Sequence, residues 1–184
     1  MTTLEIAATA FGLASVWLTV RRNIWLWPTG MVMVALYSII FYEAKLYSEV
    51  GLQVIFFVLQ IYGWHHWLRG EKTELPVTRL SGRQMLAGLG AVVAGAAALG
   101  YVMDTHTGAV LAYPDAFITT MSLAAQWLVG RKVLENWLCW ITSDVVSVGV
   151  YLDRGLYPTA GLYATFLIMA TVGYTTWKRS PRAA

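Results

Sequence analysis

Residues 135–144 read ENWLCWITSD, with two tryptophans three positions apart and an aspartate four positions later, inside an apolar run from 134 to 152. Such a run can cross the ~30 Å hydrocarbon core of a bilayer, which takes ~20 helical residues. An ionised side chain near the middle of a span costs ~2.5–3.5 kcal/mol on insertion scales. The stretch therefore predicts a membrane helix whose carboxylate needs a partner or a ligand.

The composition of the whole chain is that of a membrane protein. Its 184 residues are 58% hydrophobic and 12% charged, and the mean hydropathy is +0.57. This is too little polar surface to coat a soluble globule of the same length. The pI of about 9.1 does not indicate a nucleic-acid partner, because the basic residues form short clusters between apolar runs, as they do beside membrane spans.

Seven apolar segments are expected to form membrane helices, at 3–20, 24–43, 46–68, 85–103, 112–130, 134–152 and 158–177. A polar cytoplasmic linker, 69–84, separates the third from the fourth, and a cytoplasmic tail, 180–184, ends the chain. Eleven of the 13 basic residues fall on one side: Arg21, Arg22, Arg69, Lys72, Arg79, Arg83, Arg131, Lys132, Lys178, Arg179 and Arg182. By the positive-inside rule, the N-terminus lies outside and the C-terminus in the cytoplasm.

An internal repeat organises these segments. A shift of 110 positions superimposes Trp27 on Trp137, Leu46 and Tyr47 on Leu156 and Tyr157, Leu52 on Leu162, Phe56 on Phe166, Gly63 on Gly173, Trp67 on Trp177 and Arg69 on Arg179. Two three-helix units, 1–68 and 112–179, would then run in the same direction, with the 85–103 helix as an inverted linker. This all-α, three-one-three arrangement of parallel repeats is used by transporters, which bind substrate near the midplane between the halves.

One face of the sixth segment gathers the residues that could bind a ligand. Trp137, Trp140 and Asp144 are spaced i, i+3 and i+7, so they share a helical face. No Lys or Arg lies at comparable depth in another span. The remaining polar candidates inside spans are Tyr37, Gln53, Gln60 and Gln126. Two indole walls with a carboxylate and amides suit a flat, cationic ring that carries hydroxyl groups.

Simpler interpretations exist for each of these residues except the aspartate. Trp137 could be an interfacial belt residue, and a buried Gln or Tyr could only join helices. Asp144 differs, because ionisable residues inside a membrane are functional by default. His65 and His66 are adjacent on a helix and point ~100° apart, so they are interpreted as an interfacial pair, and no metal site or cofactor is expected. The only cysteine, Cys139, excludes an internal disulfide.

At these motifs the sequence resembles the PnuC family of vitamin and nucleoside transporters. The most specific match is the pattern W-x-x-W-x-x-x-N/D, present as Trp137, Trp140 and Asp144. The likeness covers essentially the whole chain and includes the stretches NIWLWPTG (23–30), LYSEVGLQ (46–53), YGWHHW (62–67) and ENW (135–137).

The resemblance implies a seven-helix relative of the SWEET sugar transporters in the bacterial plasma (inner) membrane. It also implies facilitated diffusion of nicotinamide riboside, followed by trapping when a separate soluble kinase phosphorylates the substrate in the cytoplasm. Trp137, Trp140 and Asp144 would line the substrate site, with Tyr37, Gln53 and Gln60 beside them. Because this chain has Asp at the last motif position, thiamine or another vitamin or nucleoside is an alternative substrate.

Other functions remain open at the level of sequence. Asp144 could exchange a proton as substrate binds, which would make the protein a proton-coupled carrier. A membrane receptor or assembly subunit would bind ligand without moving it. An enzyme is disfavoured because no nucleophile or complementary acid accompanies Asp144. The oligomeric state is open too, a homo-oligomer included.

Overall fold

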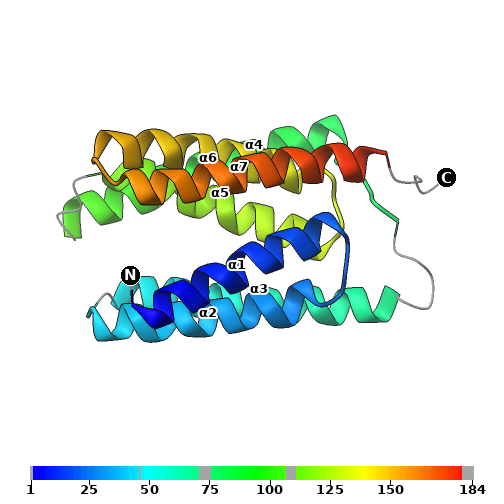
Figure 1. The fold of residues 1–184 in the computed structure, drawn as a ribbon. Helices are drawn as coiled ribbons and strands as arrows, with labels where there is room; N and C mark the ends of the chain where they lie inside the picture. Colours follow the sequence, from blue (N-terminus) through cyan, green and yellow to red (C-terminus); the bar gives the residue numbers. More distant parts are fainter. Residues whose placement is uncertain (1, 46, 71–75, 107–110, 180–184) are drawn as a thin grey trace.

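A computed structural model describes residues 2–45, 47–70, 76–106 and 111–179, and these form seven helices (Figure 1). The helices are α1 (Thr3–Val20), α2 (Leu26–Glu43), α3 (Tyr47–Gly70), α4 (Gly82–His106), α5 (Ala112–Gly130), α6 (Asn136–Asp153) and α7 (Tyr157–Lys178). All seven have between 18 and 25 residues. The prediction of seven helices is confirmed. Residues 71–75 of the predicted linker and the tail at 180–184 lie outside the described residues.

The largest difference from the predicted boundaries is at α4, which begins at Gly82 rather than at 85. Ser81 and Gln84 explain the early start by a reciprocal cap. The Ser81 N–H donates to Gln84 Oε1 at 2.9 Å, and the Gln84 N–H donates to Ser81 Oγ at 3.3 Å. These bonds satisfy backbone donors of the first turn.

Three of the described helices, α1, α2 and α4, are long and apolar enough to cross a membrane by length and composition alone. The buried polar side chains are concentrated elsewhere, on α3, α5 and α6, with Thr19 of α1 the exception. Polar side chains that face a protein interior lower the mean hydropathy of a helix even though they do not contact water.

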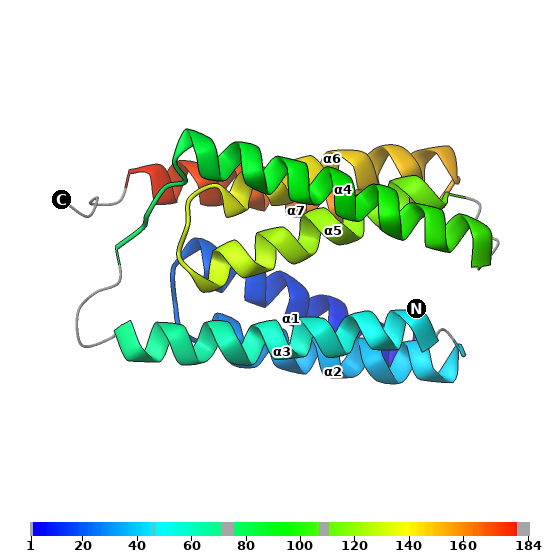
Figure 2. The same cartoon turned by 180° about the vertical axis from the view of Figure 1, so that it is seen from behind.

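Six helices form a closed ring. Within the described residues, α1 packs on α2, α2 on α3, α3 on α5, α5 on α6, α6 on α7 and α7 back on α1. The fourth helix lies outside this ring and packs against α5 (Figure 2). We call the α3–α5 and α7–α1 contacts the two seams, because they join the first three helices to the last three.

One end of the ring, which we call the basic end, carries Arg21, Arg22, Arg131, Lys132, Lys178 and Arg179 in its connections and near the C-terminus (Figure 1). Beside these residues lies a cluster of four tryptophans, Trp27, Trp67, Trp137 and Trp177, each at most 2% exposed. Trp27 meets Trp67 edge-on at 5.5 Å and 84°. Trp137 meets Trp177 in the same way at 5.5 Å and 89°. The tryptophan cluster thus closes the basic end with two matching aromatic pairs.

Glycines make room for two of these rings. A Cβ atom on Gly63 of α3 would overlap the indole of Trp27, and one on Gly173 of α7 would overlap the indole of Trp137. The other two tryptophans bond across the seams. Trp67 Nε1 donates to the Val129 carbonyl oxygen, and Trp177 Nε1 donates to the Thr19 carbonyl oxygen, both at 3.1 Å.

Residues 76–80, which we call the strap, dock on the connection between α5 and α6. The Thr78 N–H donates to the Lys132 carbonyl at 3.0 Å, the Leu134 N–H donates to the Thr78 carbonyl at 2.9 Å, and the Leu80 N–H donates to Glu135 Oε2 at 3.0 Å. Val77 of the strap is 8% exposed and packs in the tryptophan cluster. Part of the predicted polar linker is therefore ordered structure.

Candidate functional site

The predicted face of α6 points into the ring. Trp137 is 1% exposed and Asp144 is 4% exposed, while Trp140 is half-buried and packs against the tryptophan cluster. This burial excludes a lipid-facing position for Asp144. The next residue of the same face, Ser147, is completely buried.

Asp144 has no compensating base among the described residues. No hydrogen bond or ion pair of its carboxylate is found there. Tyr163 of α7 interacts electrostatically with Asp144 and with Tyr37 on α2. Three helices of the ring therefore contribute polar groups to the surroundings of Asp144.

Gln60 of α3 is a second buried polar group, 4% exposed. Its Oε1 atom has no hydrogen-bond partner among the described residues. An amide oxygen left unpaired in a protein interior costs ~1–3 kcal/mol, so such an atom indicates a place where a ligand or water completes the bonding.

Tyr37 and Gln53 are only half-buried. Tyr37 stacks on Phe41 of the same helix, with ring centroids 5.7 Å apart. Gln53 lies seven residues, about two turns, from Gln60 along α3. These two candidates lie farther from the tryptophan cluster than Gln60 does.

Three buried polar residues were not among the predicted site residues. Ser147 Oγ and Asn136 Oδ1 are buried without a hydrogen-bond partner in the described part of the chain, and Ser143 Oγ lies 3.3 Å from Ser122 Oγ of α5. Ser147 could have been found, because it follows Trp140 by seven and Asp144 by three and so continues their helical face. Asn136 precedes Trp140 by four and Ser143 follows it by three, so the same spacing rule could have found them too. Gln126 of α5, noted in the sequence, is 8% exposed.

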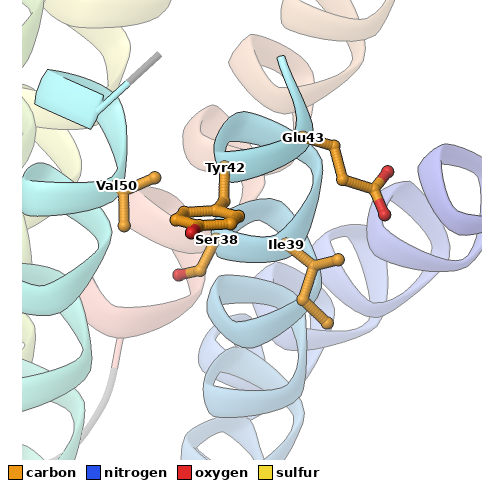
Figure 3. A pocket seen from close by; sticks show the side chains of 5 residues that line it. All are labelled: Ser38, Ile39, Tyr42, Glu43 and Val50. Carbon is orange, nitrogen blue, oxygen red and sulfur yellow. The ribbon is translucent and has the colours of Figure 1, made fainter. Parts of the chain in front are cut away.

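A separate pocket lies between α2 and α3, lined by Ser38, Ile39, Tyr42, Glu43 and Val50 (Figure 3). It contains none of the predicted site residues. Ile39 and Tyr42 are 47% and 65% exposed, so the pocket opens on the outside of the ring. It is a surface groove and does not connect the polar groups of α3 and α6.

One member of the histidine pair, His66, has an aromatic role. His66 stacks on Tyr62 at 6.0 Å, and Tyr62 stacks on Trp127 of α5 at 4.9 Å and 9°. His65 is exposed. Within the described residues, no three His, Cys, Asp or Glu side chains are grouped so that they could hold a metal ion.

Comparisons with known proteins agree on one family. The family model described as nicotinamide mononucleotide transporter matches residues 2–179. The nicotinamide riboside transporter PnuC of Escherichia coli (strain K12) is 29% identical over 97% of this chain and 86% of its own length. The riboflavin/roseoflavin transporter RibM of Streptomyces davaonensis is 22% identical over 94% of this chain and 83% of its own length.

The fold is shared with a solved member of the same group. The crystal structure of the vitamin B3 transporter PnuC superimposes with a TM-score of 0.78 and 24% sequence identity, over 96% of this chain and 80% of that one. The resemblance found in the motifs at 23–30, 62–67 and 137–144 is confirmed. The chain belongs to the nicotinamide mononucleotide transporter family, whose members include the PnuC membrane transporters.

Proposed function

We propose that this protein carries nicotinamide riboside across the bacterial plasma membrane by facilitated diffusion and has no enzymatic activity. The observation that carries the proposal is the uncompensated, buried carboxylate of Asp144 in a chain similar over 97% of its length to a nicotinamide riboside transporter. The pyridinium ring of this substrate is cationic, and its ribose has hydroxyl donors. Asp144 offers both a counter-charge and an acceptor.

The site that we propose lies inside the ring of helices, on the side of the tryptophan cluster that faces away from the basic end. Trp140 forms a wall for the flat ring by cation–π contact, and Trp137, which is fully packed against Gly173, forms the floor. Gln60 and Asp144 accept substrate hydroxyls, with Tyr37 and Gln53 toward the opposite end. Tyr163 and Ser147 complete the polar lining.

We further propose that the two three-helix units are parallel repeats in a SWEET-like, three-one-three fold. Equivalent positions 110 apart support this by making equivalent contacts. The contact of Trp27 with Gly63 matches that of Trp137 with Gly173, and the hydrogen bond from Trp67 to Val129 matches that from Trp177 to Thr19. The backbone conformation also matches, because Arg22 and Lys45 have positive φ angles and so do Lys132 and Gly155. The basic end then lies in the cytoplasm, where a soluble kinase would phosphorylate the substrate and keep the flux inward.

Uptake into proteoliposomes tests the proposal. Labelled nicotinamide riboside should equilibrate across the membrane at a rate that saturates, and excess unlabelled substrate should cause counterflow. Accumulation that follows an imposed pH gradient would establish proton coupling instead of diffusion. Binding without counterflow would identify a receptor and refute transport.

Riboflavin is the second candidate, because the RibM relative carries it. Its ring system is neutral, so Asp144 would act on it through hydrogen bonds alone. Quenching of indole fluorescence in purified protein, titrated with nicotinamide riboside, thiamine, riboflavin and uridine, separates the candidates. Tightest binding of riboflavin would overturn the nicotinamide riboside proposal.

A further inference from the structure

Gly30 occupies an unfavourable place for a glycine. It is buried in the second turn of α2, after Pro28 and Thr29. A glycine in a helix interior costs ~1 kcal/mol relative to alanine. Its presence there therefore calls for a reason in the packing around it.

The reason is the side chain of Gln60. A Cβ atom at position 30 would lie 2.9 Å from both Cδ and Oε1 of Gln60, and closer still to Nε2. Real Cβ atoms do not approach heavy atoms this closely, so with alanine at position 30 the amide would have to move. The absence of a side chain at Gly30 thus allows the Gln60 amide to lie against the backbone of α2.

In the second half of the molecule the large and the small residue of this pair exchange helices. The positions 110 residues later are Trp140 on α6, in place of Gly30, and Ala170 on α7, in place of Gln60. In one half the large side chain comes from the third helix of the unit, and in the other half from the second. The helices that carry these two large side chains, α3 and α6, both pack on α5.

We propose that Gly30 is a positioning residue, which sets the place where the Gln60 amide meets the substrate. The inference rests on the proposed function of the ring interior as a binding site. Gln60 Oε1 is buried and unpartnered in the described part of the chain, so it is an acceptor that a polar hydrogen of a bound substrate completes. Any side chain at position 30 displaces that acceptor.

A double-mutant cycle separates this role from simple helix packing. The variants are Gly30→Ala, Gln60→Ala and the double variant, with Gly161→Ala as the matched control, because a Cβ there meets nothing within 4 Å. Loss of one hydrogen bond of ~1–1.5 kcal/mol corresponds to about a tenfold rise in the dissociation constant. We expect this rise in Gly30→Ala and in Gln60→Ala, and no further rise in the double variant.

The dissociation constant is measured by indole quenching with whichever of nicotinamide riboside, thiamine, riboflavin and uridine binds the unchanged protein most tightly. A failure of the nicotinamide riboside proposal alone therefore leaves the cycle intact. Two results would overturn the positioning role. One is wild-type affinity in Gly30→Ala, and the other is that Gly30→Ala lowers the affinity by the same factor in the unchanged protein and in Gln60→Ala. Binding of none of the four ligands would overturn both proposals.

Folding of the variants gives an independent readout. If Gly30→Ala prevents folding through the overlap with the Gln60 amide, the double variant should recover a monodisperse protein, since the overlapping atoms are gone. Failure of the double variant to recover would assign Gly30 to contact between helices and overturn the proposal.

Discussion

Trp67 and Trp177 make equivalent hydrogen bonds across the two seams of the helix ring. Their ring centroids lie 6.5 Å apart, and each donates its indole N–H to a backbone carbonyl at 3.1 Å across a different seam. The acceptors, Val129 and Thr19, are themselves 110 residues apart. The two halves are therefore joined at the basic end by a reciprocal pair of bonds.

Trp67→Phe and Trp177→Phe should destabilise the protein by similar amounts. Each change keeps an aromatic ring but removes one hydrogen bond, at a cost of ~0.5–1.5 kcal/mol, while the carbonyls of Val129 and Thr19 keep the backbone N–H groups of Lys132 and Arg22 as donors. Thermal unfolding in detergent measures the effect, and Trp17→Phe, at a residue 47% exposed, is the control. A large loss for one variant and none for the other would contradict the equivalence of the seams.

Asp144→Asn and Asp144→Ala should weaken binding of a cationic substrate without unfolding the protein. Removing a charge-assisted hydrogen bond of ~1.5–3 kcal/mol raises the dissociation constant roughly 10- to 100-fold. The alanine variant should lose more, because the asparagine keeps an acceptor. Binding is measured by indole quenching, with Val145→Ala, at a residue 53% exposed on the same helix, as the control. Unchanged affinity in Asp144→Ala would remove this residue from the site.

Trp137→Phe and Trp140→Phe should affect different properties. Trp137 is packed against Gly173 and Trp177, so its truncation leaves a cavity and lowers the melting temperature. Trp140 is only half-buried, and phenylalanine keeps a weaker π face, so the change should remove part of the ~0.5–2 kcal/mol that a cation–π contact contributes to affinity for a cationic ring. Both quantities are measured on both variants. A lower affinity in Trp137→Phe together with a lower melting temperature in Trp140→Phe would exchange the roles proposed for these two residues.

Glu135→Ala should loosen the strap, whereas Glu135→Gln should keep it docked. The alanine variant loses the acceptor of the Leu80 N–H, while a glutamine oxygen preserves it. The rate of tryptic cleavage after Arg79, an exposed residue of the strap, reports the difference. Equal rates in both variants would show that this bond does not hold the strap.

The parts of this structure that follow from runs and periods along the chain could be predicted. Apolar length gave the helices, and for α1 and α5 the predicted and observed bounds coincide, while the spacing of Trp137, Trp140 and Asp144 placed one inward face. The docked strap and the pairing of Gly30 with Gln60 could not be predicted, because each depends on which distant segments become neighbours. The site roles of Tyr37, Gln53, Gln60, Trp137, Trp140 and Asp144 stay predictions.

The strap makes the two seams unequal, because it lies beside the α3–α5 seam and not beside the α7–α1 seam. Within the described residues, the α3–α5 side has the Trp67 bond, and Lys132 Nζ lies 4.3 Å from the centroid of the Trp67 ring. The three strap bonds tie residues 78 and 80, which follow α3 in the chain, to the α5–α6 connection. The α7–α1 side has the Trp177 bond. If the halves part at the basic end, a pivot on the α3–α5 side leaves the Trp67 bond and the docked strap in place and breaks the Trp177 bond instead.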